Sequence, residues 1–220
     1  MAVPWPTLER VSTPEGALEL RRGGELDFLI TIGGRVLMSS RAHRSEDALS
    51  RLGCAPLAGQ KAPRVLVSGL GLGYSLRAAL DALPRGARVT VVELNPHVVQ
   101  WCRGPLAPLS GNALADPRVE VEVADVARVI GAARGRFDAI LLDLYEGPHA
   151  GSRRRDDPFY SAAALARTHA ALRKGGVLAV WGEEIDTPFE RRLAAAGFAT
   201  SRTREGRGSG VHVIYIGRRG

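Results

Sequence analysis

The sequence is poor in cysteine and in aromatic residues: its 220 residues include only Cys54 and Cys102, and aromatic side chains make up 5% of the chain. The two cysteines are far apart and have no C-x-x-C spacing, so we expect buried free thiols rather than a disulfide framework or a zinc site. No apolar run approaches the roughly 18 residues that a membrane-spanning helix needs. The opening segment, MAVPWPTLER, lacks a basic region followed by an apolar core, so no secretory signal is expected and the cytoplasm is the predicted location.

Acidic residues are in the minority, since 30 Lys and Arg against 23 Asp and Glu give a formal net charge of +7. This charge would suit an anionic partner such as nucleic acid. The basic residues are spread along the chain, however, and form no stripe with interleaved aromatic residues, so we do not expect a nucleic-acid partner. The densest basic cluster is Arg153, Arg154 and Arg155, which forms either a solvated loop or a contact for a phosphate or carboxylate on a substrate.

From residue 64 onward, short apolar runs alternate with amphipathic segments, a pattern typical of βαβ units and a parallel sheet. The predicted strands are residues 64–69, 88–94, 119–124, 137–143, 176–182, 198–204 and 211–217. The predicted helices lie near residues 74–83, 95–103, 126–134, 160–173 and 187–196. Only the short segment EGRGSG separates the last two strands. We therefore expect an α/β fold with a seven-stranded, mostly parallel sheet that ends in an antiparallel hairpin.

The first sixty residues differ in kind from the rest. ALELRR, LDFLITI and GGRVLMSS predict two or three antiparallel strands joined by glycine-rich turns. SEDALSRLG predicts a short helix that ends at Gly53. We expect a small N-terminal β-unit with its linking helix over residues 1–60, followed by the larger α/β domain over residues 61–220.

A glycine-rich turn follows the first strand of the larger domain. In VLVSGLGLGYSLRAAL, Gly69, Gly71 and Gly73 have the spacing GxGxG. Glycines let the backbone turn sharply and let a ligand approach the main chain at the start of a helix. A dinucleotide-binding fingerprint would have glycine at position 74, where this chain has Tyr74, which argues against NAD or FAD.

Acidic residues end the next two strands. Glu93 lies about 20 residues beyond the glycine turn, where an acid can accept hydrogen bonds from both ribose hydroxyls. Asp125 follows the third strand and can meet the exocyclic amine of an adenine. Each acid alone could equally cap the helix that follows it. Together with the glycine turn, they predict a nucleoside bound across the carboxyl edge of the sheet.

The segment LLDLYEGP runs from an apolar strand directly into Asp143, Tyr145, Glu146 and a Gly-Pro turn. An alkylamine has a pKa near 10.4, so making it a free nucleophile at pH 7 costs roughly 4 to 5 kcal/mol. A carboxylate beside the amine binds the cation and accepts its proton during attack. Tyr145 can orient the substrate or lie over a cation. We expect these residues to face an acceptor; the alternative is a simple turn with exposed acids.

The motifs GLGLG, VVELNP and VADVARVI, with the terminal hairpin, resemble the class I S-adenosylmethionine-dependent methyltransferase superfamily over about residues 64–217. That resemblance implies a Rossmann-like sheet and an S-adenosyl donor. Within the superfamily, the chain is most similar to the spermidine synthases, which carry an N-terminal β-unit and an acidic D-x-x-D loop followed by Gly-Pro. DDPFYSAAALARTHAALRKGGVLAV also resembles a family segment. The resemblance implies that Asp143 binds the attacking amine and helps to remove its proton.

We therefore predict a transferase that uses S-adenosylmethionine or its decarboxylated form, most similar to an aminopropyltransferase that acts on an amine acceptor. Chain-specific features keep other readings open: Glu146 replaces the second Asp of the family motif, Trp181 stands at the position of a usual Gln, and residues 44–46 are Arg-Ser-Glu in place of Tyr-His-Glu. His149, after the Gly-Pro turn, is a candidate alternative base near neutral pH.

Two alternatives stay open. The first is a methyltransferase that acts on a small or anionic acceptor reached through the Arg153 to Arg155 segment. The two donors differ by one carboxylate, so a basic side chain near the glycine turn would favour the methyl donor; Arg35, Arg41 and Arg44 are the candidates. The second alternative is a catalytically silent nucleoside-binding protein. A homodimer through the N-terminal strands is compatible with each reading.

Overall fold

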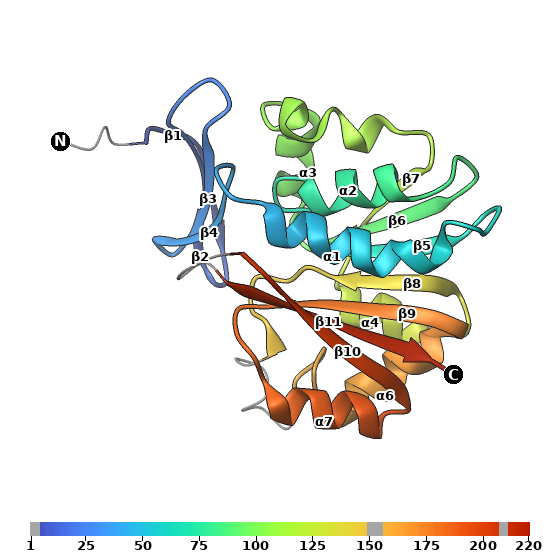
Figure 1. Ribbon diagram of the computed structural model, residues 1–220. Helices are drawn as coiled ribbons and strands as arrows, with labels where there is room; N and C mark the ends of the chain where they lie inside the picture. Colours follow the sequence, from blue (N-terminus) through green and yellow to red (C-terminus); the bar gives the residue numbers. More distant parts are fainter. Residues whose placement is uncertain (1–4, 149–155, 207–210) are drawn as a thin grey trace.

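The computed structural model describes residues 5–148, 156–206 and 211–220, and it contains two sheets (Figure 1). The small antiparallel sheet has the order β1-β2-β3-β4 and comprises β1 (Thr7–Thr13), β2 (Gly16–Arg22), β3 (Phe28–Ile32) and β4 (Arg35–Ser39). The large sheet has the order β10-β11-β9-β8-β5-β6-β7 and comprises β5 (Arg64–Ser68), β6 (Arg88–Glu93), β7 (Val119–Val123), β8 (Phe137–Leu142), β9 (Leu172–Gly182), β10 (Phe198–Glu205) and β11 (His212–Arg219). Strands β5 to β9 pair in parallel and β11 is antiparallel to both its neighbours, which confirms the predicted fold class.

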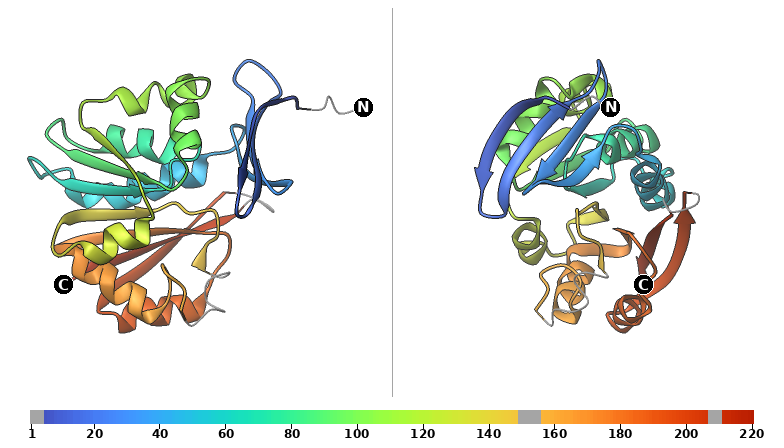
Figure 2. Two further views of the ribbon diagram at one scale, coloured as in Figure 1. Left: turned by 180° about the vertical axis from the view of Figure 1, so that it is seen from behind. Right: turned by 90° about the vertical axis from the view of Figure 1, so that its left-hand side faces the viewer.

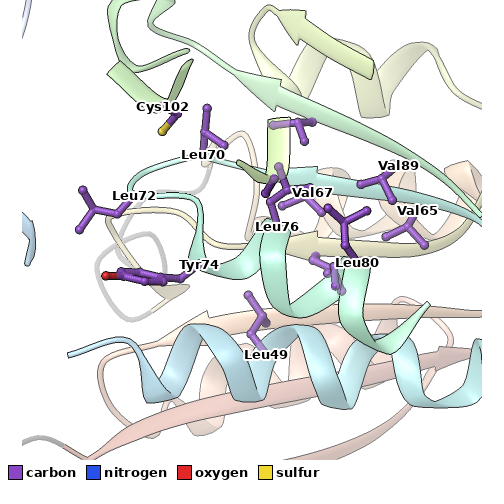
Figure 3. Close-up of a cluster of buried hydrophobic side chains, with 14 of the residues drawn as sticks. Leu49, Val65, Val67, Leu70, Leu72, Tyr74, Leu76, Leu80, Val89 and Cys102 are labelled. Atoms are coloured by element: carbon purple, nitrogen blue, oxygen red, sulfur yellow. The ribbon is translucent and has the colours of Figure 1, made fainter. Parts of the chain in front are cut away.

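Helices cover both faces of the large sheet. They are α1 (Arg44–Cys54), α2 (Tyr74–Ala82), α3 (Pro96–Arg103), α4 (Val126–Ala132), α6 (Ala162–Ala171) and α7 (Thr187–Ala195). Successive strand residues point to opposite faces, so Val65 and Val67 of β5 pack with α1 and α2, whereas Leu66 packs on the side of α4, α6 and α7. Figure 3 shows Leu49 of α1 beneath α2, in the first of these two cores. Both faces of the central strands are therefore buried, as expected for a parallel sheet between two layers of helices.

The small sheet stands at the end of the large sheet where β8 terminates (Figures 1 and 2). It is attached to the helices by polar contacts: the Trp101 Nε1 of α3 donates to Glu9 Oε2 of β1 at 2.7 Å, and the Tyr74 hydroxyl donates to the Ser40 carbonyl at 3.3 Å. The His43 ring also stacks on Tyr74 with ring centroids 4.1 Å apart. Tyr74, which occupies the position of the missing fingerprint glycine, therefore helps to hold the small sheet in place.

The small sheet has four strands rather than the two or three predicted. The first, β1, has the sequence TLERVST and is mostly exposed, so it lacks the buried alternation that reveals a strand. Elsewhere the predicted boundaries agree with the structure to within a few residues. β9 begins at Leu172 rather than 176, because a bulge interrupts its pairing with β8 before the regular register resumes at Val177.

Both cysteines are buried free thiols, as predicted. Within the described residues, no helix has the length and apolarity needed to cross a membrane.

The prediction that the first helix ends at Gly53 is wrong. Helix α1 continues to Cys54 and leads directly into a 3-10 turn. A Cβ atom at Gly53 would overlap Leu141 Cδ2 and lie 3.0 Å from Ala179 Cβ, in β8 and β9. Gly53 is therefore a close-approach residue that lets α1 pack against the sheet.

We expect Gly53→Ala to lower the free energy of unfolding by about 1–3 kcal/mol, because overpacking of the core outweighs the gain in helix propensity. Gly131→Ala is the matched control: Gly131 is also helical, but its nearest neighbour to an added Cβ is Arg167 Cδ at 3.7 Å. This control should be neutral or stabilising by up to about 1 kcal/mol. Urea denaturation of both variants measures the difference, and a stabilised Gly53→Ala would contradict the close-packing role.

Candidate functional site

A cavity of about 1200 Å³ lies between the small sheet and the carboxyl ends of the parallel strands. Parallel strands bring their ends to one edge, which is where ligands bind in open α/β sheets. All but one of the sequence-predicted site residues line this cavity, namely Gly69, Gly71, Glu93, Asp125, Asp143, Tyr145 and Glu146. The exception is Gly73, where a Cβ would lie 3.0 Å from Ser110 Cβ, so this glycine allows close packing behind the turn.

The glycine turn between β5 and α2 is enclosed by the small sheet and by the segment after β8. Gly69 and Gly71 have φ angles of +79° and +51°, which favour glycine. A Cβ at Gly69 would overlap the Asp143 carbonyl oxygen, and one at Gly71 would lie 2.6 Å from Met38 Sδ. The Leu72 amide also donates to Met38 Sδ at 3.2 Å. The turn therefore needs glycine both for its conformation and for the close approach of its neighbours.

Glu93 is the last residue of β6, and its carboxylate accepts hydrogen bonds from the backbone of the glycine turn and of the segment after β6. Its Oε2 accepts from the Leu70 amide and its Oε1 from the Asn95 amide, both at 2.8 Å. Burial raises the pKa of Glu93, while the backbone amides of Asn95 and Leu70 oppose that shift. Each carboxylate oxygen has a second lone pair, so Glu93 can accept further hydrogen bonds from a ligand. Sequence reasoning placed the acid correctly but missed that it also holds the glycine turn.

Asp125 both caps a helix and lines the cavity. Its Oδ1 accepts from the Ala127 amide at 2.8 Å at the start of α4, and the residue is exposed. In the described part of the chain, its Oδ2 accepts no hydrogen bond. Asp125 can therefore cap α4 through Oδ1 and accept a hydrogen bond from a ligand amine through Oδ2.

Asp143 is a cavity carboxyl whose surroundings move its pKa into the neutral range. It follows β8, and the Ser75 hydroxyl of α2 donates a hydrogen bond to its Oδ2. Burial, together with the negative charge of Glu46, raises the pKa of Asp143 to about 7, and the Ser75 hydrogen bond opposes this shift. A carboxyl that titrates near neutrality can both accept and release a proton under physiological conditions.

Three further carboxylates line the cavity, those of Glu15, Glu46 and Asp157, and sequence reasoning had assigned none of them to the site. Glu46 lies in the first turn of α1, where its Oε2 accepts from the Ser45 hydroxyl at 2.6 Å. Asp157 is buried, and its Oδ1 accepts from the Phe159 and Tyr160 amides at 2.8 and 2.6 Å. These contacts hold Glu46 and Asp157 in place in the cavity lining. The sequence signals for them were the Glu of residues 44–46, which stands where the family has Tyr-His-Glu, and the DDPFY segment, which contains Asp157 and resembles the family.

The acidic segment after β8 also meets the small sheet. Tyr145 is exposed, and the Arg35 Cζ of β4 lies 5.4 Å from the centroid of its ring. Of the three arginines that the sequence could not place, Arg35 lines the cavity, whereas Arg41 is ion-paired with Asp27 at 2.9 Å. Arg44 is not among the residues that line it. His149 and the Arg153 to Arg155 segment lie outside the described residues.

Trp181 at the end of β9 stands beside Asp143. β8 and β9 are parallel, with Leu142 opposite Val180, so the next residue of each strand is a neighbour on the same face. Both residues line the cavity, and the Trp181 ring lies 5.0 Å from the His212 ring. An aromatic wall beside a carboxylate suits an alkylammonium group.

Comparisons with known proteins agree on one family. Residues 52–190 match the model of the spermine/spermidine synthase domain. The chain is 31% identical over 133 residues to a polyamine aminopropyltransferase of Pseudomonas syringae pv. tomato, which covers 60% of this chain and 43% of that protein. It is 30% identical over 194 residues to a polyamine aminopropyltransferase of Mycobacterium tuberculosis, covering 82% of this chain and 34% of that protein. The matched regions thus span less than half the length of these relatives.

The fold is also that of solved spermidine synthases. The structure of spermidine synthase from Thermotoga maritima has a TM-score of 0.77 with 17% sequence identity, covering 97% of this chain and 73% of that one. A spermidine synthase in complex with the transition state analogue AdoDATO has a TM-score of 0.74 with 18% identity, covering 97% and 72%. At these identities the likeness establishes the arrangement of the elements.

Proposed function

The chain belongs to the spermine/spermidine synthase family, and from this premise we propose that it transfers an aminopropyl group from decarboxylated S-adenosylmethionine to an amine acceptor. The observation that carries the proposal is the position of Asp143. This carboxyl, with its pKa raised to about 7, lies at the strand end beside the glycine turn, in a cavity lined by further carboxylates. Such a group suits the removal of a proton from an attacking amine.

The donor nucleoside fits the half of the cavity formed by the ends of β5, β6 and β7. Gly69 and Gly71 present main chain to the ligand, Glu93 accepts hydrogen bonds from the ribose hydroxyls, and Asp125 accepts one from the adenine amine. Gly73 supports this site from behind by allowing the turn to pack against Ser110. The donor itself supplies the sulfonium group that makes the neighbouring carbon electrophilic.

The reaction is a displacement in which the chain binds the amine, orients it and takes its proton. Asp143 and Glu46 hold the acceptor ammonium, and Tyr145 and Glu146 direct it toward the donor. The amine nitrogen forms a bond to the carbon next to the sulfonium, the carbon–sulfur bond breaks with its electrons passing to sulfur, and the amine proton passes to Asp143. The products are the aminopropylated amine and the neutral thioether 5′-methylthioadenosine. Holding nucleophile and carbon in line supplies much of the rate advantage of such a step.

The cavity has the opposite charge to the whole protein. The acids that line it are Glu15, Glu46, Glu93, Asp125, Asp143, Glu146 and Asp157, and the basic side chains among its lining residues are Arg35 and His97. The net charge of +7 repels a cation only weakly at distances beyond the Debye length of about 8–10 Å. Near the site, the local acids dominate, so a cationic amine is attracted where it reacts.

The second candidate is methyl transfer from S-adenosylmethionine, and the observation that favours it is Arg35 in the cavity lining, because a guanidinium can bind the methionine carboxylate. Calorimetric titration with both donors separates the two functions. Tighter binding of the decarboxylated donor by tenfold or more, about 1.4 kcal/mol, with release of 5′-methylthioadenosine on addition of an amine, is the expected result. Preference for S-adenosylmethionine would assign the chain to methyl transfer. Binding without turnover of any amine would support a silent nucleoside-binding protein.

We also propose that the enzyme is a homodimer through its N-terminal strands. Leu8 of β1 and Val36 of β4 are 48% and 55% exposed, so each edge strand of the small sheet presents a large apolar side chain to solvent. β1 is at the edge of the small sheet, where its outer backbone can pair with a second copy. Size-exclusion chromatography with light scattering should give twice the monomer mass of 23.5 kDa, and a monomer at high concentration would contradict the proposal.

A further inference from the structure

Among the residues that the structure describes, Arg35 differs from the other arginines of the small sheet in that its side chain has no polar partner. Arg10 and Arg21 are ion-paired with Glu19, and Arg22 donates to backbone carbonyls. Among the described residues, no carboxylate forms an ion pair with Arg35, and its only recorded contact is with the Tyr145 ring. An arginine held over an aromatic ring keeps its donors free for a ligand, because cation–π contact uses the face of the guanidinium and leaves its edge exposed.

The segment after β8 links this guanidinium to Asp143, because Arg35 contacts the Tyr145 ring. Tyr145 follows Asp143 by two residues, and two extended residues span at most about 7 Å. Arg35 and Asp143 also line the same cavity, so one small substrate can reach both. The cavity therefore offers a carboxylate for an amine at one point of its lining and a cation for an anion at another.

The acceptor is a better candidate for this anion than the donor. Within β4, the residue that touches the glycine turn is Met38, whose sulfur accepts from the Leu72 amide. Arg35 lies three residues earlier and contacts the acidic segment after β8 instead. Arg35 therefore lies on the side of the cavity near the segment after β8, where we place the acceptor, rather than beside the glycine turn, where we place the nucleoside.

We propose that Arg35 is a specificity-determining residue that binds a carboxylate on the acceptor, so that the preferred substrate class is an ω-amino acid rather than a diamine. The inference rests on the aminopropyl transfer proposed above. The amine of such an acceptor binds at Asp143 and its carboxylate at Arg35. A diamine of equal length would bring its second ammonium toward the guanidinium, and like charges at short range disfavour binding.

The test compares 4-aminobutanoate with 1,4-diaminobutane, which have the same carbon chain. Binding is measured by calorimetry in the presence of 5′-methylthioadenosine, and turnover by release of that thioether from the decarboxylated donor. We expect the wild-type protein to favour 4-aminobutanoate by about tenfold or more in affinity and in kcat/KM. Arg35→Gln should remove this preference, and Arg35→Lys should retain part of it. Arg41→Gln, which alters an arginine paired with Asp27 in the same region, is the matched control and should leave the preference unchanged.

The outcomes separate this inference from the proposed function. Turnover with a wild-type preference for 1,4-diaminobutane that Arg35→Gln does not change would overturn the role of Arg35 and leave aminopropyl transfer intact. Absence of turnover with both acceptors would remove the proposed function, while the binding ratio would still decide whether Arg35 selects a carboxylate. Failure of 4-aminobutanoate to bind overturns the inference. If Arg35→Gln weakens the binding of S-adenosylmethionine but not that of its decarboxylated form, Arg35 binds the carboxylate of the donor. The assignment of Arg35 to the acceptor is then wrong.

Discussion

Asp143→Asn is expected to lower kcat by about 10²- to 10⁴-fold, the usual contribution of a positioned general base. An asparagine has nearly the same shape and can still accept the hydrogen bond that Ser75 donates to Asp143. The substitution therefore removes the proton acceptor with little change in geometry, and the affinity for the donor should stay within a few-fold of the wild type. Single-turnover release of 5′-methylthioadenosine and calorimetric titration with the donor measure the two quantities. An Asn variant with unaltered kcat would show that Asp143 is not the base.

The pH dependence of kcat/KM provides a second test of the role of Asp143. The pKa of Asp143 is about 7, so below that pH the carboxyl is protonated and cannot accept the amine proton. We expect kcat/KM to fall about tenfold for each pH unit below 7 and to level off above it. The negative charge of Glu46 contributes to the raised pKa of Asp143. Ser75→Ala removes the hydrogen bond that lowers this pKa and should move the acidic limb to higher pH.

Stability should change in the opposite direction to activity. Because burial and Glu46 raise the pKa of Asp143 in the folded protein, the carboxyl binds a proton more tightly folded than unfolded. Stability therefore falls as the pH rises from about 4, near the ordinary value for Asp, to about 7, and the full cost is present above 7. Asp143→Asn removes that charge, so its Tm should exceed the wild-type Tm at pH 8, with the difference disappearing near pH 4. A variant that loses both activity and Tm at pH 8 would indicate a structural role instead.

Sequence patterns predicted those parts of the site that depend on local structure. Glu93, Asp125 and Asp143 each follow an apolar strand, and the topology of a parallel sheet necessarily brings such strand ends to one edge. The parallel pairing of the central strands follows from the alternation of apolar runs and helices, and the terminal hairpin from the short segment between the last two strands. In these cases the local pattern and the overall fold agree, which is why they could be predicted.

The missed parts depend on how distant elements pack together. Glu46 and Arg35 reach the cavity only because α1 and the small sheet dock against the strand ends, and no spacing in the sequence encodes that docking. Gly53 was assigned to the end of a helix because glycine commonly has that role, whereas its actual role is set by Leu141 and Ala179 in two later strands. Asp157 belongs to a segment that resembles the family, but its local pattern does not predict that it lines the same cavity as Asp143.

Glu93→Ala is expected to weaken the binding of the donor by at least about 100-fold and also to lower the free energy of unfolding. The buried carboxylate accepts from the Leu70 and Asn95 amides, and each buried amide left without a partner costs about 1–3 kcal/mol. The glycine turn would lose the contact that holds it against β6. Calorimetric titration with the decarboxylated donor and urea denaturation measure the two effects. Asp125→Ala is the comparison variant, because it removes an exposed helix cap worth about 1 kcal/mol and should destabilise the protein less.

Two roles of Glu93, in holding the turn and in binding ribose, can be separated with a modified ligand. If Glu93 accepts hydrogen bonds from the ribose hydroxyls, the wild-type protein should bind 5′-methylthioadenosine at least tenfold more tightly than its 2′-deoxy analogue. The Glu93→Gln variant has only one acceptor oxygen in its side chain, so this ratio should shrink toward one. An undiminished ratio in Glu93→Gln would mean that another group binds the ribose and that Glu93 acts through the glycine turn alone. Because Leu70 lies within that turn, such a result would make the carboxylate a positioning residue for the donor site.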